Sequence, residues 1–278
     1  METINNRIKM APVVVLPGVL AGPESKPLYA GILDEQRSID PPDTTRFHPI
    51  PERGLGDKDD MYSQVEEDLL KTYDHLEQPY VLVGHSLGGY FAVKFAMQHP
   101  EVVASTICLA GAQEGIQKET LAVKALKSFI ENVIGANSDY EHLLHDSETM
   151  VNFREMLKKS WPEHNSLELI SSDRDPLFPL PYGLGVKLPK GQKPKTYILG
   201  KTTAQARQIE NVPRHTIGFP SPRLVRSSGI VNPNGVISRL INNHISIPAH
   251  KSVIDHTKKV RAAAATLTSK SPDFAMAA

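Results

Sequence analysis

The stretch Val81-Leu82-Val83-Gly84-His85-Ser86-Leu87-Gly88-Gly89-Tyr90 decides the fold of this chain. The aliphatic run that opens it predicts a short buried strand, and residues 90–98 carry apolar side chains at helical spacing. Between the two lies Gly-x-Ser-x-Gly, in which the glycines leave room for the backbone to fold back on itself. The stretch therefore predicts a strand, a tight turn and a helix, with Ser86 at the carboxyl end of the strand.

This placement makes Ser86 a candidate nucleophile. The helix that follows would aim its free N–H groups and the positive end of its dipole at the same spot, where an oxyanion would be stabilised. The backbone N–H of Leu87 is the natural first donor. The alternative is that Ser86 only caps the helix.

Composition limits the class of protein. The chain has 278 residues, of which 40% are hydrophobic and 22% charged, which predicts one globular domain over residues 1–278. Its formal net charge is zero and its pI is about 7.2, which gives no attraction to nucleic acid or to an anionic membrane surface. The single cysteine, Cys108, excludes an internal disulfide framework, and its apolar surroundings predict a buried thiol.

Segments that direct a protein to or across a membrane are not apparent. Residues 1–10 are polar and lack the apolar region of a signal peptide, and no stretch approaches membrane-spanning length. We therefore expect a cytoplasmic protein with no transmembrane segment; secretion by a signal-independent route is the alternative.

Strand and helix patterns alternate along the chain, which predicts a mostly parallel sheet flanked by helices. Besides the opening stretch, the expected strands are 11–16, 45–50, 104–112, 167–172 and 236–241, and the expected helices are 26–36, 63–77 and 247–268.

The residues Gly-His-Ser-Leu-Gly-Gly at 84–89 resemble the nucleophile elbow of the α/β-hydrolase superfamily, particularly its lipases and esterases. Only about ten residues precede the first strand, so the two antiparallel strands that open larger members do not fit. The resemblance thus implies the reduced, lipase-like sheet. It also implies that the helical pattern at about 113–165 forms a cap over the active site; the alternative is an extra helical layer.

A second oxyanion donor is implied by the loop Pro17-Gly18-Val19-Leu20, which follows the first strand. Lipases of the superfamily carry a similar glycine-containing loop there, often with a histidine where this chain has Pro17. Val19 is the candidate N–H donor, with Leu20 next; the alternative is a plain connection between strand and helix.

The base comes last in this superfamily, after the serine and the acid. His244 follows the expected last strand, and Asn-His-Ile-Ser-Ile before a helix resembles the histidine loop of small lipases. His244 is therefore the candidate base, and His215 is the alternative. His250 and His256 fall within the expected final helix, where we expect surface positions.

The acid is less sharply defined. Asp175 follows the expected strand 167–172 and precedes a proline, as in the acid loop of the superfamily, with Asp173 next. If 195–200 is the acid-bearing strand, residues 201–205 offer no carboxylate. Ser227-Ser228-Gly229 also resembles a lipase segment with serine in place of aspartate, which leaves Glu210 or no acid at all.

The combined prediction is a serine hydrolase that cleaves small-molecule or lipid carboxylic esters through an acyl-enzyme, without a metal or organic cofactor. Ser86, His244 and Asp175 would form the triad, and Leu87 and Val19 the oxyanion hole. Thioesterases, lactonases, amidases and acyltransferases use the same machinery. The second hypothesis is a hydrolase-like binding protein or receptor that has lost turnover, and the ambiguous acid keeps it open.

Overall fold

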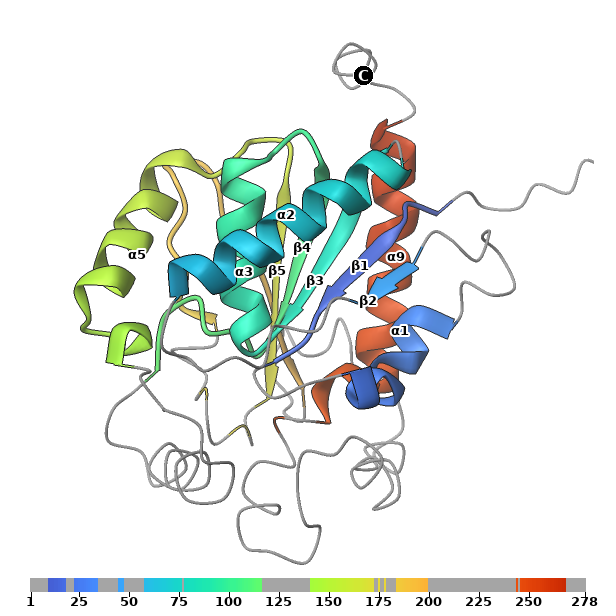
Figure 1. Ribbon diagram of the computed structural model, residues 1–278, viewed down its shortest axis with the longest axis horizontal. Helices are drawn as coiled ribbons and strands as arrows, with labels where there is room; N and C mark the ends of the chain where they lie inside the picture. Colours follow the sequence, from blue (N-terminus) through green and yellow to red (C-terminus); the bar gives the residue numbers. More distant parts are fainter. Residues whose placement is uncertain are drawn as a thin grey trace, which may run out of the picture.

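The computed structural model describes residues 10–18, 23–34, 45–47, 58–76, 78–116, 141–172, 175, 178, 184–199, 244 and 246–268. Its centre is a six-stranded sheet in the order β2-β1-β3-β4-β5-β6, in which every neighbouring pair is parallel (Figure 1). The strands are β1 (Val13–Leu16), β2 (Thr45–Phe47), β3 (Tyr80–His85), β4 (Val103–Leu109), β5 (Ser166–Ser172) and β6 (Lys195–Leu199).

The three strands at the centre, β1, β3 and β4, are buried along their whole length. Helices cover both faces of such a parallel sheet, so its strands read as continuous apolar runs rather than alternating ones. The apolar run before Ser86 therefore predicts a buried strand, and the structure has it as β3.

Helices lie on both faces of the sheet (Figure 1). They are η1 (Pro23–Tyr29), α1 (Ala30–Asp34), α2 (Lys58–Leu76), α3 (Leu87–Gln98), η3 (Glu141–Leu143), α5 (Glu148–Ser160), η6 (Ile247–Ala249) and α9 (Lys251–Thr268). α3 packs against β1, β3, β4 and α2, whereas α9 packs against β3, β4 and α1. No described helix is both long and apolar enough to cross a membrane.

The fold class expected from the sequence is confirmed: a parallel sheet between two helical layers, with no antiparallel strand in the described part of the chain. Individual elements differ at their ends. The strand expected over 45–50 is described only at 45–47, and the helix expected over 63–77 already begins at Lys58. The strand expected at 236–241 lies outside the described residues.

The expected cap at about 113–165 is described only in part. Its final helix, α5, packs on α3, where the Phe153 and Tyr90 rings meet edge to face with centroids 4.7 Å apart. Residues 117–140 lie outside the described residues, so the cap stays a prediction.

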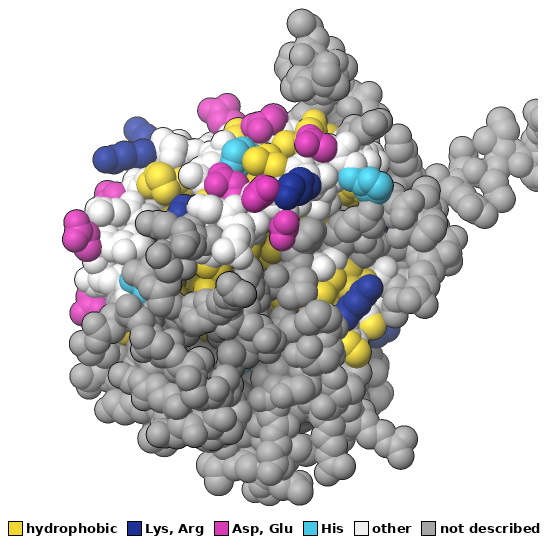
Figure 2. All heavy atoms as spheres, viewed as in Figure 1, with side chains coloured by type: hydrophobic (Ala, Val, Ile, Leu, Met, Phe, Trp, Pro, Cys, Tyr) yellow, Lys and Arg dark blue, Asp and Glu magenta, His cyan; other side chains and the backbone are white. Residues whose placement is uncertain are grey.

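The described part of the face drawn in Figure 2 carries both acidic and basic side chains, with the acidic ones predominating along its upper part. Lys71 and Glu67 of α2, for example, form an exposed ion pair at 2.7 Å.

Candidate active site

Ser86 occupies the turn between β3 and α3 in a strained backbone conformation, with φ 57° and ψ −123°. Residues other than glycine rarely adopt a positive φ, and such strain costs about 1–3 kcal/mol, so it persists only where the surroundings enforce it. This conformation is the sharp strand-to-helix turn that the Gly-x-Ser-x-Gly pattern predicted.

Three backbone hydrogen bonds hold the turn. The Ser86 N–H donates to the Leu109 carbonyl over 3.1 Å, and the Ser86 carbonyl accepts from the N–H groups of Gly89 at 3.0 Å and Ala112 at 2.9 Å. Two of these partners belong to β4 and the loop after it. The neighbouring strand therefore fixes the nucleophile as much as its own helix does.

The two glycines of the motif are required by space. A Cβ atom on Gly84 would lie 2.3 Å from the Gly88 carbonyl oxygen, and one on Gly88 would lie 2.3 Å from the Leu16 carbonyl oxygen. Real Cβ atoms do not approach backbone this closely, so any larger residue would open the turn.

Gly18 places the loop after β1 directly against the nucleophile. A Cβ atom built on Gly18 would lie 2.9 Å from the Ser86 Cβ and 3.4 Å from its Oγ. Val19 and Leu20, the candidate second donors, lie outside the described residues. Leu87 is the first residue of α3, so its N–H has no acceptor within the helix and lies at the positive end of the helix dipole.

Asp175 and His244 form a buried hydrogen-bonded pair, with 2.8 Å between His244 Nδ1 and Asp175 Oδ2. The other carboxylate oxygen of Asp175 accepts the Phe178 N–H over 3.1 Å. Because a carboxylate only accepts hydrogen bonds, it holds the proton of His244 on Nδ1. Asp175 and His244 are 69 residues apart in the chain, and the fold brings these two candidates into contact.

The second ring nitrogen of His244, Nε2, is buried and has no hydrogen-bond partner among the described residues. The ring stacks on that of His85, with centroids 4.8 Å apart, and His85 immediately precedes Ser86 in the chain. With its proton held on Nδ1, His244 presents at Nε2 the lone pair that a general base requires. The alternatives Asp173, Glu210 and His215 lie outside the described residues.

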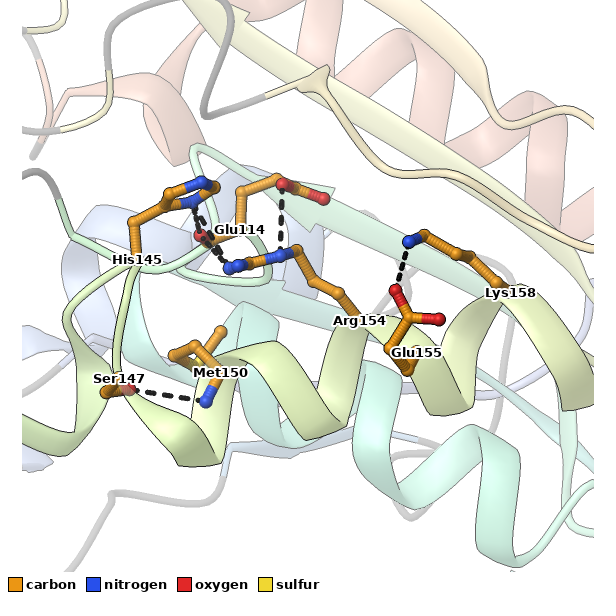
Figure 3. Close-up of polar contacts among 7 residues, drawn as sticks. All are labelled: Glu114, His145, Ser147, Met150, Arg154, Glu155 and Lys158. Atoms are coloured by element: carbon orange, nitrogen blue, oxygen red, sulfur yellow. Dashed lines mark hydrogen bonds and ion pairs between the residues drawn. The ribbon is translucent and has the colours of Figure 1, made fainter.

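The loop after β4 is anchored to α5 by a polar cluster (Figure 3). The Glu114 carbonyl accepts hydrogen bonds from Arg154 Nη1 at 3.0 Å and from His145 Nδ1 at 2.6 Å. Burial raises the pKa of the Glu114 carboxyl group, and the positive charge of Arg154 opposes this effect. This loop carries Ala112, so the cluster supports the backbone that holds Ser86.

The surface positions expected for His250 and His256 are wrong. His256 Nε2 lies 2.8 Å from Glu168 Oε2, and both side chains are largely buried between α9 and β5. Burial also lowers the pKa of His250. The buried positions of α9 include Val253, Thr257, Val260 and Ala264, and His256 falls on this same helical stripe.

Tyr29 and His85 are contributors that the sequence reasoning missed. The Tyr29 hydroxyl donates to His85 Nδ1 over 2.8 Å, and His85 Nε2 donates to the His244 carbonyl over 3.1 Å. Within the described part of the chain, no group of three or more His, Cys, Asp or Glu side chains is arranged to hold a metal ion.

These features together define the class. The parallel sheet of the described residues, the strained serine turn after β3 and the order of serine, acid and histidine along the chain agree with the α/β-hydrolase fold. The family model described as "alpha/beta hydrolase fold" matches residues 36–161, a segment that contains the Ser86 turn. The chain therefore has the α/β-hydrolase fold.

Several solved structures of low sequence identity are similar to this chain. The chain is 12% identical to 2-hydroxy-6-oxo-6-phenylhexa-2,4-dienoate hydrolase from Rhodococcus sp. strain RHA1, covering 68% of this chain and 82% of that one with a TM-score of 0.49. It is 19% identical to a putative lipase from Acinetobacter baumannii AYE, covering 68% and 76% with a TM-score of 0.43.

A third similar structure is the monoacylglycerol lipase of Paleococcus ferrophilus, with 15% identity, coverage of 67% of this chain and 83% of that one, and a TM-score of 0.42. No curated protein sequence matches the chain.

Proposed function

We propose that the chain is a serine hydrolase that cleaves carboxylic esters, with Ser86 as nucleophile, His244 as base and Asp175 as the acid that orients the base. One observation carries the proposal: Asp175 holds His244 by Nδ1 at 2.8 Å, while the buried Nε2 has no partner among the described residues. A histidine held in this way beside a strained serine is arranged for proton transfer.

In the proposed mechanism, Ser86 Oγ attacks the ester carbonyl carbon and its proton passes to His244 Nε2. The carbonyl oxygen becomes an oxyanion facing the Leu87 N–H at the positive end of α3, with the Val19 N–H as second donor. When the tetrahedral intermediate collapses, the ester C–O bond breaks and His244 gives its proton to the leaving alcohol.

Water then attacks the acyl-enzyme with His244 as base once more, which releases the carboxylic acid and restores Ser86. Asp175 keeps its charge throughout and stabilises the imidazolium formed in each half-reaction. The position of Asp175 favours this mechanism over a binding protein without turnover, because the latter hypothesis drew its support from an undefined acid. The cap at about 113–165 and the cytoplasmic location stay predictions.

Turnover of p-nitrophenyl esters of increasing acyl length tests the proposal. We expect saturable hydrolysis by the intact chain and a loss of about 10³-fold or more in kcat for Ser86→Ala. Ser160→Ala is the matched control, because Ser160 is an exposed serine at the end of α5 whose hydroxyl donates to the Met156 carbonyl one turn earlier. Equal hydrolysis by the two variants would contradict the proposal.

A parallel panel of thioesters and amides distinguishes an ester hydrolase from thioesterases and amidases, which use the same catalytic groups. The proposal expects the highest kcat/KM for an ester, whereas a clear preference for a thioester would reassign the substrate and leave the triad in place.

A further inference from the structure

His85 lies between a tyrosine and the proposed base. Its Nδ1 is 2.8 Å from the Tyr29 hydroxyl, its Nε2 is 3.1 Å from the His244 carbonyl oxygen, and its ring stacks on the His244 ring at an interplanar angle of 29°. All three residues are buried. Their separation in the chain is large, 56 residues from Tyr29 to His85 and 159 from His85 to His244.

The direction of each hydrogen bond follows from its partners. A backbone carbonyl can only accept, so His85 must carry a proton on Nε2. Burial raises the pKa of Tyr29, so its hydroxyl keeps its proton and can donate. Burial, and to a lesser extent the nearby His244, lowers the pKa of His85 well below its ordinary value. A neutral His85 with its proton on Nε2 therefore accepts from Tyr29 at Nδ1.

We propose that Tyr29 and His85 form a positioning relay for the base, in which the Tyr29 hydroxyl holds the His85 ring at Nδ1 and His85 holds the backbone and ring of His244. The inference rests on the proposed function of His244. In the reaction, His85 moves no proton; it acts only through His244, and so is a positioning residue.

The relay complements the bond to Asp175. Asp175 holds the His244 side chain at Nδ1, and His85 holds the same residue at its main-chain carbonyl. With both ends fixed, Nε2 can point in few directions. A misplacement of about 1 Å at a reacting group can cost about 100-fold in rate, so a second point of attachment matters for catalysis.

The relay also reaches the other side of the site. A hydrogen bond with the Gly18 backbone acts on the Tyr29 hydroxyl and counteracts part of its pKa rise, and Gly18 lies directly against Ser86. Tyr29 thus contacts both the loop beside the nucleophile and the residue that holds the base. Among the described residues, Tyr29 from η1 and His244 face the His85 ring. Because His85 is neutral, it adds no charge that would oppose protonation of His244.

Two substitutions of similar size separate the two ends of His85. The amide of His85→Gln reaches the position of Nε2 and can still donate to the His244 carbonyl. The shorter amide of His85→Asn reaches the position of Nδ1, so it keeps the Tyr29 hydroxyl paired but loses His244. Both variants lose the ring stacking equally, so the comparison isolates the hydrogen bond to His244.

We expect His85→Asn to lose about 30-fold in kcat with little change in KM, and His85→Gln to stay within about fivefold of the intact chain. The second readout is the low-field proton resonance of the His244 Nδ1–H that bridges to Asp175, assigned by its absence in His244→Ala. It should broaden or shift in His85→Asn and persist in His85→Gln. Thermal unfolding confirms that each variant is folded.

Equal behaviour of the Asn and Gln variants, in rate and in resonance, would overturn the relay, because His85 would then only fill space. If the intact chain hydrolyses no ester, the proposed function fails, but the resonance still reports on the relay. Tyr29→Phe gives an independent check: we expect a loss of about threefold to tenfold in kcat, since the buried Nδ1 of His85 then loses its partner and the ring is held at Nε2 alone.

Discussion

Two largely buried carboxylate–histidine pairs among the described residues have the same separation between their bonded atoms. Asp175 and His244 meet at 2.8 Å, and Glu168 and His256 also meet at 2.8 Å. In the first pair His244 uses Nδ1 and leaves Nε2 without a partner among the described residues. In the second pair His256 uses Nε2, and Glu168 binds Lys195 as well, at 2.9 Å.

The two pairs also lie at different positions in the fold. Glu168 lies within β5, in register with Lys195 of β6, and faces α9. Asp175 comes three residues after the strand ends, on the side where β3 delivers Ser86. Ligands bind at the carboxyl ends of parallel strands, so the proposed function places the substrate beside the first pair and not beside the second. A short distance between an acid and a histidine is therefore not evidence of catalysis by itself. The proposal for His244 depends on its place at the carboxyl ends of the strands and on its Nε2, which has no partner among the described residues.

The largest expected contrast is between the two histidines. His244→Ala should reduce kcat by about 10³-fold to 10⁴-fold, because the base is lost. His256→Ala should leave kcat within about threefold and instead lower the free energy of unfolding by about 1–3 kcal/mol, because a partner of buried Glu168 is removed. Ester turnover and urea unfolding measure the two effects.

This comparison would break if His256→Ala lost activity as severely as His244→Ala while remaining folded. The second pair would then take part in the reaction, and the distinction by placement would be wrong.

Next in size is the contrast between the two acids. Asp175→Asn should reduce kcat by about 10³-fold or more, since an amide can donate to Nδ1 and so favours the wrong tautomer of His244. Glu168→Gln removes the charge that holds His256 and Lys195, so it should affect stability rather than rate. The ratio of kcat values for the two variants is the measurement, and a ratio near one would contradict the account.

A smaller effect is expected from crowding the nucleophile while leaving both pairs intact. In Gly18→Ala the new methyl group would lie 2.9 Å from the Ser86 Cβ, so the loop or the serine must shift by a few tenths of an ångström. We expect kcat/KM to fall about tenfold, with a thermal midpoint close to that of the intact chain. An unchanged kcat/KM would show that the loop after β1 adjusts without consequence for Ser86.

The smallest effects concern pH, and they separate the two regions. Burial tends to raise the pKa of Glu168, but hydrogen bonds from His256 and Lys195 outweigh it and hold this pKa below its usual range. The contribution of Glu168 to stability is thus present above the pKa of an unfolded glutamate, about 4.3, and is lost as the pH falls through the lower folded value.

Near the site, the pKa of His85 is lowered mainly by burial, so the unfolded chain binds its proton first as the pH falls below about 6.5. As the pH falls, urea unfolding should therefore show a first loss of stability below about pH 6.5, which His85→Gln reduces. A second loss should follow below about pH 4.3, which Glu168→Gln reduces. The same pH profile for both variants and the intact chain would contradict this assignment.

Local patterns explain what could be predicted from the sequence. The strand, turn and helix around Ser86 are encoded within residues 80–98, and the structure has them as β3 and α3. Asp175 and His244 could be proposed because a resemblance to a known family gave their order along the chain. Their hydrogen bond spans 69 residues, so no local pattern could show that they meet.

The errors and omissions have physical causes too. The polarity of His256 favours a surface position, but helical spacing places it on the buried stripe of α9, and the spacing decides. The contact between Tyr29 and His85 depends on how η1 packs on β3, which a single sequence does not encode locally. Val19 as oxyanion donor and the cap stay predictions.

The most direct test of the central claim is labelling of the folded chain with a fluorophosphonate, followed by mass analysis of its peptides. We predict a single adduct, on Ser86, that is absent in Ser86→Ala, strongly slowed in His244→Ala and formed normally in His256→Ala. A folded chain that does not react, or a Ser86→Ala variant that is labelled as fast as the intact chain, would contradict the account.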